Sequence, residues 1–306
     1  MKTFFQKVIY FIKNITLPGF DHQPIFKVFG FLIKGFNKSA LTVRASSVAY
    51  NIFLSIIPAL IFFFSALAYL PIPNFTHELL KLLNDIMPVN AYITVRSTII
   101  DIVQHKRAGL LSFGFITTLY FATNGMNSII AAFNATEHTF DNRNWFQRQG
   151  IAFILLMIVS VFIIVAISLI IFSGIAFHYL HTTGIIKSWL LYFLLYFGKW
   201  IIVLASFFFS VSVLYYFAPA RKSKFRLISA GSSLATVLII LISVGFSFYV
   251  NNFGQYNKIY GSLGTVIVLL LWIYLNALAL LIGYELNWSI RHSKVKPPDT
   301  TPLEKI

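Results

Sequence analysis

Charged residues are scarce in this 306-residue chain: they make up 11% of it, whereas hydrophobic residues make up 58%. A soluble domain has about 25% charged and roughly 45–50% apolar residues. The composition therefore excludes an ordinary water-soluble globule. It equally excludes intrinsic disorder, because disordered segments are poor in hydrophobic residues.

Cysteine is absent altogether. Its absence excludes a disulfide framework, a thiolate nucleophile and a cysteine-based metal site. The apolar N-terminal stretch is interrupted by Lys7 and Lys13, and no small-residue cleavage site follows it. We therefore do not interpret this stretch as a signal peptide.

Acidic residues are few as well, with 9 Asp and Glu against 24 Lys and Arg, which leaves a formal net charge of +15. Such an excess is typical of proteins that bind nucleic acid, and also of the cytoplasmic side of membrane proteins. The positions of the basic residues decide between these two possibilities.

Long apolar runs dominate what is present. Six segments reach the roughly 20 residues that a membrane-spanning helix needs, and they cover residues 48–70, 109–131, 150–177, 188–216, 227–250 and 261–283. Five contain no charged residue, and the fourth contains only Lys199. The sequence predicts an all-α, polytopic membrane protein with six transmembrane helices.

The loop charges predict the orientation. With the N-terminus inside, 17 of the 24 basic residues fall in the loops and termini of one side. Because cytoplasmic loops are rich in Lys and Arg, both termini are expected to be cytoplasmic. The positive charge is then a signal of topology, and we expect no nucleic-acid partner.

Three regions follow from these spans. Residues 1–43 form a basic, amphipathic arm, which either lies in the interface of an anionic leaflet or packs on the protein's own cytoplasmic surface. Residues 44–290 form the transmembrane domain, and 291–306 a flexible cytoplasmic tail. In the first outer loop, the patterns of Phe75–Met87 and Tyr92–Gln104 predict a small helical hairpin.

Polar residues inside spans are the usual pointers to function. Lys199 either lies near mid-bilayer as a substrate or ion contact, or reaches the outer headgroups beside Trp200. Arg44 precedes the first span and Glu285 follows the last one. Both would lie at the cytoplasmic ends of their helices, where an ion pair between them could tie the first helix to the last. The alternative is a role in gating or in headgroup contact.

Four asparagines, Asn51, Asn124, Asn127 and Asn276, lie within spans. Asn124 and Asn127 share a helical face, and they could line a polar path or join helices by hydrogen bonds. Pro58 is expected to kink the first span. Small residues around Gly231 in the fifth span, and Gly261 and Gly264 in the sixth, predict closely packed helix faces.

No arrangement of residues indicates catalysis. Metal-ligand spacings and clustered His, Asp and Glu residues are missing from the sequence, so we predict neither catalytic residues nor a metal or other cofactor. A nuclease would need acid–base groups or carboxylates that hold a metal ion. Phe supplies 33 of the aromatic residues, mostly inside the spans, which is typical of lipid-facing surface.

Four segments resemble a known family. RASSVAYNIFLSIIPALIFFFSAL (44–67) is similar to the first span of the YihY/BrkB family of bacterial inner-membrane proteins, and YGSLGTVIVLLLWIYLNALALLIGYELN (260–287) to its last span. NSIIAAFNATEHTFDNRNWFQRQ and YYFAPARKSKFR resemble the family's segments after span two and before span five. An expected Trp shortly after Asn134 is absent.

The resemblance implies a six-span protein of the bacterial inner membrane. Older ribonuclease BN labels for the family are generally regarded as mistaken, and some members are linked to serum resistance or envelope-lipid transport. The family has no agreed catalytic residues to carry over.

Our leading hypothesis is a non-enzymatic protein that moves or organises a lipid or another amphiphile, with anionic headgroups on the cytoplasmic side as partners. The alternatives are a structural or assembly factor and, least favoured, a ribonuclease. A polar groove reaching Asn124, Asn127 or Lys199 would favour transport, whereas a dry, mutually satisfied core would favour assembly. The oligomeric state stays open.

Overall fold

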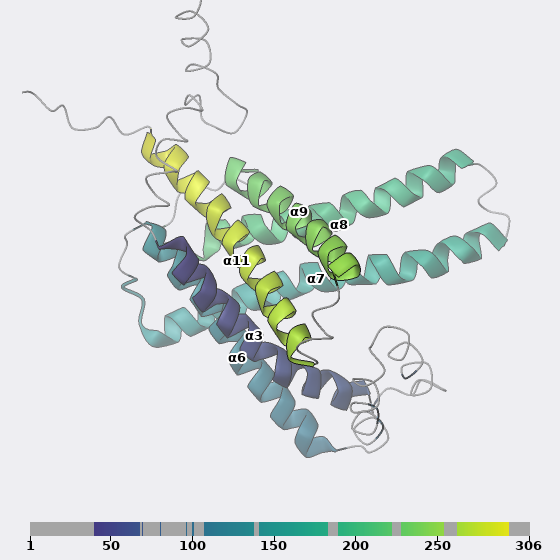
Figure 1. Cartoon of the computed structure of the whole chain (residues 1–306), viewed down its shortest axis with the longest axis horizontal. Coiled ribbons are helices and arrows are strands. Elements are labelled where there is room, and N and C mark those ends of the chain that lie inside the picture. The colour runs from purple at the N-terminus through teal and green to yellow at the C-terminus, as the bar shows by residue number, and fades with distance from the viewer. Residues whose placement is uncertain are drawn as a thin grey trace, which may run out of the picture.

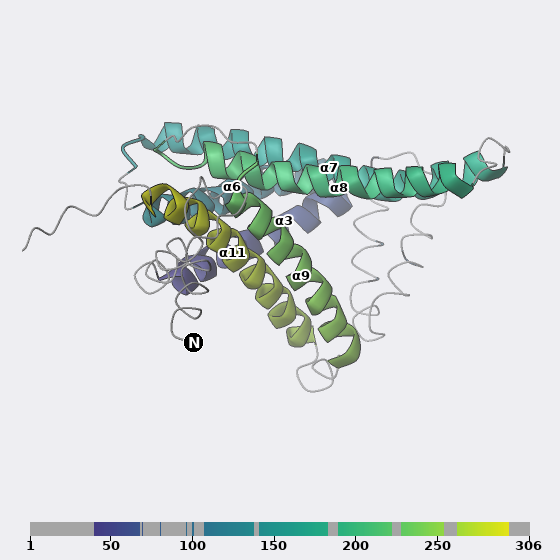
Figure 2. The same cartoon turned by 90° about the horizontal axis from the view of Figure 1, so that it is seen from above.

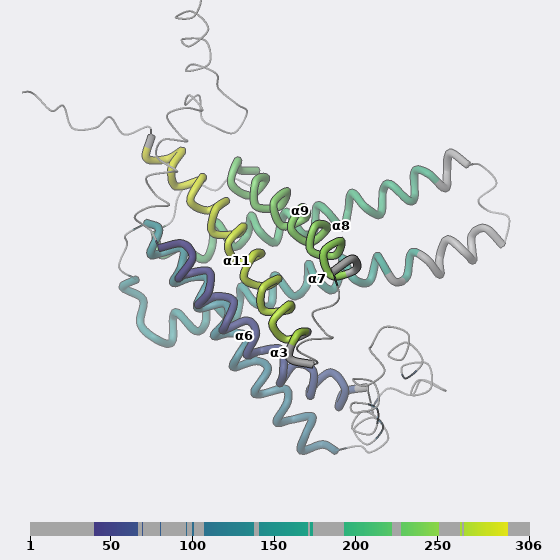
Figure 3. Tube along the Cα trace, in the orientation of Figure 1, coloured from purple at the N-terminus to yellow at the C-terminus, as the bar shows by residue number. Residues whose placement is uncertain are grey.

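The computed structural model describes residues 40–67, 107–137, 141–182, 189–221, 228–253 and 262–293, together with a few single positions between them (Figures 1 and 3). This part of the chain is helical and contains no strand. Its helices are α3 (Leu41–Leu67), α6 (Ala108–Thr136), α7 (Trp145–Thr182), α8 (Trp189–Phe217), α9 (Ala230–Phe253) and α11 (Ser262–Ser293).

Five of these helices, all except α6, are long and apolar enough to cross a membrane. The exception, α6, is long enough at 29 residues, but it is the one that carries both Asn124 and Asn127 as well as several threonines. The predicted class, a polytopic helical membrane protein, is confirmed. Each of the six predicted spans coincides with one helix.

The helices form three antiparallel pairs, α3–α6, α7–α8 and α9–α11, which converge at one end and diverge toward the other (Figures 1 and 2). Contacts between α11 and α3 join two of the pairs along their sides. The α7–α8 pair projects furthest from the rest of the molecule (Figure 2). Because successive helices are antiparallel, the start of α3 and the end of α11 lie at the convergent end.

Helices at the convergent end extend beyond the apolar runs in the sequence. Helix α3 begins at Leu41 rather than near residue 48, and α11 continues to Ser293 rather than ending near residue 283. Helices α6 and α7 are extended at the same end. Hydropathy did not identify these helical turns because they carry charged and amide side chains, although their backbone is helical.

The buried core lies mainly at this convergent end. Three aromatic rings, Phe133 of α6, Tyr215 of α8 and Tyr284 of α11, form its centre. The rings of Phe133 and Tyr284 stack with centroids 4.2 Å apart, and Tyr215 meets both edge-on at 5.5 and 5.4 Å. The Tyr215 hydroxyl also donates a 2.6 Å hydrogen bond to the carbonyl of Leu280. One residue from each helix pair thus closes the core.

Helices α9 and α11 cross at a pair of glycines. A Cβ on Gly283 would lie 2.5 Å from the Gly231 carbonyl oxygen, 2.5 Å from the Tyr215 hydroxyl and 2.7 Å from the Cβ of Ala235. Without a hydrophobic drive between helices in lipid, such close backbone contact is what stabilises the crossing. The small-residue face expected on the fifth span is confirmed here: Gly231 and Ala235 are buried, together with Ser232.

The α3–α6 pair is in contact along most of its length. A Cβ on Gly114 would lie 2.9 Å from the backbone nitrogen of Phe62, and Gly125 faces Ile52 at ordinary contact distance. Helix α3 continues through Pro58. The kink that we expect at this proline stays a prediction.

Several expectations lie outside the described residues. These are the amphipathic arm before residue 40, the helical hairpin of the first outer loop, the basic segment 222–227 and the tail after residue 293.

The glycine crossing generates the first prediction. Replacing Gly283 by Ala forces a methyl group against the backbone of α9, and overpacking of this kind costs about 1–3 kcal/mol. We expect Gly283→Ala to lower the melting temperature of the purified protein in detergent. Gly245→Ala, also within a helix but with no atom within 4 Å of the added Cβ, is the matched control and should be neutral or slightly stabilising. Equal melting temperatures for both variants would contradict the assigned contact.

Candidate functional site

The convergent end carries a network of polar side chains that we call the polar joint. Its members come from all three helix pairs and from the turn between α6 and α7. They are Arg44, Asn134, Thr136, Glu137, Asp141, Arg143, Tyr215, Tyr284, Glu285, Asn287 and Arg291.

The predicted ion pair between Arg44 and Glu285 is present. A guanidinium nitrogen of Arg44 lies 3.8 Å from a carboxylate oxygen of Glu285, whose side chain is 2% exposed. The other terminal nitrogen of Arg44 donates to the carbonyl of Ala132 at 2.7 Å and to the hydroxyl of Thr136 at 2.6 Å. Arg44 therefore ties α3 to α11, as expected, and also to the last turn of α6.

A second ion pair joins the end of α6 to the end of α11. Arg291 donates to a carboxylate oxygen of Glu137 at 2.7 Å, and the hydroxyl of Tyr284 donates to the same oxygen at 2.7 Å. The Glu137 side chain is only 4% exposed. A carboxylate so far removed from water needs an opposite charge and hydrogen-bond donors, and α11 supplies both.

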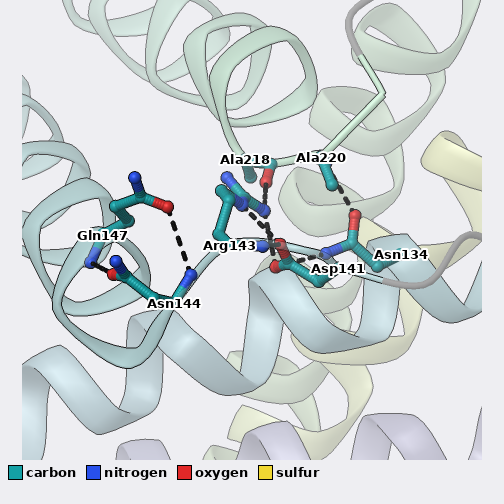
Figure 4. Close-up of polar contacts among 7 residues, drawn as sticks. All are labelled: Asn134, Asp141, Arg143, Asn144, Gln147, Ala218 and Ala220. Carbon is teal, nitrogen blue, oxygen red and sulfur yellow. Dashed lines mark hydrogen bonds and ion pairs between the residues drawn. The ribbon is translucent and has the colours of Figure 1, made fainter.

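The third ion pair, between Asp141 and Arg143, forms a clasp around the α8–α9 turn (Figure 4). The two side chains are bound in a bidentate manner at 2.6 and 2.8 Å, and Arg143 also donates to the carbonyl of Ala218 at 3.2 Å. Asn134 donates to Asp141 at 3.1 Å and accepts from the backbone N–H of Ala220 at 2.8 Å. The clasp thus holds the turn on both sides of Pro219.

Asp141 lies outside the membrane-spanning segments. Burial opposes its ionisation, but hydrogen bonds from the side chain and backbone of Arg143, and the positive charges of Arg143 and Arg148, outweigh that cost. The pKa of Asp141 is therefore lowered from its ordinary value.

Asn287 of α11 caps the start of α9. It accepts a 2.8 Å hydrogen bond from the backbone N–H of Gly231 and donates to the hydroxyl of Ser229 at 2.9 Å. The same hydroxyl accepts from the backbone N–H of Ser232 at 3.1 Å, as in an N-cap. In the first turn of α9, the N–H of Gly231 is therefore satisfied by α11 and that of Ser232 by Ser229.

The charges of the joint balance. Each of its three acidic residues is paired with an arginine, and these acids are a third of the nine in the whole chain. This balance allows six ionised groups to be placed where water is scarce. These ion pairs are well suited to hold helices from all three pairs in one fixed arrangement.

Three of the four predicted asparagines form hydrogen bonds within the protein. Asn51 and Asn276 donate to carbonyls of their own helices, those of Ser47 and Trp272. Asn127 donates to the side chain of Gln149 on α7, so it joins two helices. Asn124 is half-buried on the same helix. The joining role is thus observed for Asn127.

Lys199 lies on α8, far from the joint. It precedes Phe217, the last residue of α8, by 18 positions, which at 1.5 Å per residue is about 27 Å along the axis. That distance is close to the roughly 30 Å thickness of the hydrocarbon core. Its ammonium group lies over the rings of Tyr196, at 4.9 Å, and Trp200, at 5.3 Å. These features favour the interfacial interpretation of Lys199.

Sequence reasoning missed most of the joint. Besides Thr136 and Tyr215, it missed seven residues outside the Arg44–Glu285 pair: Asn134, Glu137, Asp141, Arg143, Tyr284, Asn287 and Arg291. A signal for them was available. All lie just beyond the same-side ends of predicted spans, and they include acidic residues on the basic side of the protein. Their pairing could not be read, because it depends on which helix ends converge.

The described residues contain no group of three His, Asp or Glu side chains that could hold a metal ion.

Comparisons with known proteins agree on a family. A family model described as virulence factor BrkB matches residues 32–305. A relative from Bacillus subtilis named as a ribonuclease-like protein, YfkH, is 34% identical over 264 residues, which are 85% of this chain and 93% of the relative.

Two further relatives are named UPF0761 membrane proteins. The one from Haemophilus influenzae is 26% identical and covers 85% of this chain and 94% of its own length. The one from Vibrio campbellii is 28% identical, with 85% and 80% covered. No solved structure shows a significant match.

The Arg44–Glu285 pair generates the second prediction. Removing one partner of a buried pair costs about 3–5 kcal/mol, because the other charge stays buried. We expect Arg44→Gln and Glu285→Gln each to lower the free energy of unfolding by about that amount, and the double variant to lose less than the sum. Arg221→Gln, at an exposed arginine, is the control. Strict additivity would show that the two charges are not coupled.

Exchanging the two charges should restore stability only in part. The exchange rebuilds the ion pair, but Glu at position 44 cannot donate to the Ala132 carbonyl as Arg44 does. Full recovery in unfolding measurements would mean that the bonds from Arg44 to α6 contribute little.

Asp141 generates the third prediction. Its folded-state pKa lies below its unfolded value, so its stabilisation is complete above pH of about 4 and is lost as the pH falls through the folded pKa. At neutral pH we expect the wild type to have a higher melting temperature than Asp141→Asn. This difference in melting temperature should shrink below about pH 4. The difference between wild type and Asn144→Ala, an uncharged change in the same turn, should not vary with pH. A gap to Asp141→Asn that widened on acidification would reverse the sign assigned here.

Proposed function

This chain belongs to the family described as virulence factor BrkB, and from that premise we propose that it moves or organises a lipid or another amphiphile in the bacterial inner membrane, without catalysis. It is a membrane protein of this family, with several helices apolar enough to span a bilayer. The proposed orientation places the polar joint on the cytoplasmic side, where most basic residues fall.

The observation that carries the proposal is the divergence of the helix pairs away from the joint. Beyond the joint, helix α8 exposes Leu194, Ile201 and Leu204, and α9 exposes a stripe of Val237, Leu241, Val244 and Phe248. Apolar side chains of this kind are covered by acyl chains in a bilayer. The protein thus offers lipid-compatible surface on α8 and α9 beyond the joint, while the joint end carries the polar groups.

The surroundings of the joint support an anionic headgroup as the polar part of the amphiphile. Arg148 and the exposed Arg221 lie at the joint end, and Lys222, Lys224 and Arg226 follow in the sequence. Basic residues near a leaflet surface attract anionic lipids by about 1 kcal/mol each. The predicted partners are therefore lipids with phosphate headgroups.

One observation favours the second candidate, a structural or assembly factor. Asn127, a candidate for a polar path, donates to Gln149 across a helix contact. A protein built to hold partners rather than to move a substrate would satisfy its polar groups in this way.

The ribonuclease named in one relative has less support. In the joint, the carboxylates of Glu137, Asp141 and Glu285 each face an arginine of the same network, which disfavours the free acid–base groups or metal-binding carboxylates that RNA hydrolysis needs. Cleavage of RNA by highly purified protein, abolished by Glu137→Gln, would restore this candidate.

The fourth prediction tests transport directly. Purified protein is reconstituted into vesicles of phosphatidylethanolamine and phosphatidylglycerol that contain a fluorescent phosphatidylglycerol, and an impermeant reductant quenches the outer leaflet. We expect quenching to extend to the inner-leaflet label. Empty vesicles, and vesicles with an unrelated helical membrane protein, are the controls.

Quenching equal to that of the controls would remove the support for passive lipid movement. Lipid analysis of each leaflet in a deletion strain with acute re-expression covers energised movement. If no lipid redistributes there either, the assembly candidate becomes the better one.

A further inference from the structure

The contact between the α7–α8 pair and the rest of the molecule is confined to one end. In α7, Ala152 and Leu155 are buried, but no described side chain after Leu155 is. In α8, no described side chain before Ser206 is buried, whereas six are buried from Ser206 to Tyr215.

Before these residues, α8 is exposed around its circumference. The five successive residues Phe193–Phe197 of α8 are all exposed. Five consecutive positions cover every side of a helix with 3.6 residues per turn. The far half of α8 therefore receives little cover from other helices, as Figure 2 shows for the pair as a whole.

The α3–α6 pair behaves differently. Ser65 of α3 and Gly114 of α6 are buried at the end far from the joint, and Gly114 lies against the backbone of Phe62. This pair keeps its contact over the whole length, so divergence is not a general property of the fold.

The attachment of the α7–α8 pair combines a small apolar contact with a few directional bonds. The clasp links Arg143, just before α7, to Ala218, just after α8, and Asn134 of α6 to Ala220. Tyr215 adds one hydrogen bond to α11. These bonds lie within a short distance of one another, so they fix an angle rather than a long interface.

We propose that α7–α8 is a rigid arm that pivots at the polar joint relative to the other four helices, and that the Asn134–Asp141–Arg143 clasp sets its angle. The two helices move together because they contact each other and because Arg143, just before α7, is bonded to Ala218, just after α8. In α7, the 18 residues from Leu155 to Ser173 span about 27 Å, so a rotation of about 10° moves that end by roughly 5 Å. Such a motion widens or narrows the separation between the arm and α9.

The pivot does not rest on lipid transport. If transport is correct, the arm controls the entry of acyl chains between α8 and α9. If the protein is an assembly factor, the same arm adjusts its angle to a partner.

The fifth prediction uses the absence of cysteine, because spin labels can be placed in the natural background. One label pair, Leu194→Cys with Val244→Cys, spans the arm and α9 at exposed positions. A second, Leu60→Cys with Ile116→Cys, lies within the α3–α6 pair. A third, Ile167→Cys with Leu194→Cys, lies within the arm. Distances are measured by pulsed electron resonance in lipid nanodiscs.

Arg143→Ala should broaden the distance distribution between arm and α9, or shift it by roughly 5 Å, the displacement of the rotation above. It should leave both internal distributions unchanged. Arg143→Lys keeps the charge but loses the bidentate bond, and should give an intermediate width. Arg148→Ala, which removes a neighbouring charge, is the matched control.

Two outcomes would overturn the pivot. One is an arm-to-α9 distribution in Arg143→Ala and Arg143→Lys that matches wild type. The other is a broadening of all three distributions together, because it would indicate loss of the fold rather than motion about a joint. Neither outcome depends on whether the vesicle experiment detects lipid movement.

Discussion

An ionised side chain that leaves water needs an opposite charge beside it, and this requirement organises the whole convergent end of the protein. Three ion pairs lie there, and in each of them an acidic side chain is bound by an arginine. Two of the pairs connect different helices, α3 with α11 and α6 with α11, and the third holds the turn between α8 and α9. Meeting the cost of burial therefore also determines which helix ends come together.

The rest of the fold depends on a weaker force. Lipid tails are as apolar as the helix surfaces, so helices in a bilayer gain little from burying leucine. They remain in contact where small residues allow their backbones to approach, as at Gly231 with Gly283 and at Gly114 with Phe62. Along the far half of α8 no such contact forms: a Cβ added at Gly198 would have no atom within 4 Å, and the residues before it are exposed. A polar, well-bonded end and an apolar, open end follow from the same absence of water.

This division bears on function more than any single residue does. The convergent end joins the three helix pairs through the charge-balanced polar joint, so it is suited to stay fixed while other parts of the protein move. The open end exposes apolar side chains of α8 and α9, which suits acyl chains or the apolar face of a partner. Family membership agrees with a membrane role. One relative has a ribonuclease-like name, but the carboxylates of the joint are each paired with an arginine.

The sequence by itself determined the helices, their number and their alternating direction, because runs of about 20 apolar residues can satisfy their backbone in lipid only as helices. It also indicated Arg44 with Glu285, since each stands next to the end of a span on the same side. Only the tertiary structure shows the other hydrogen-bond partners. Glu137 is bonded to Arg291 and Tyr284, some 150 positions away, and Asn134 is bonded to the turn after α8. Hydropathy identifies the apolar segments of a sequence, but it does not indicate which other helix each segment contacts. The polar turns that make those contacts lie where the hydropathy signal ends.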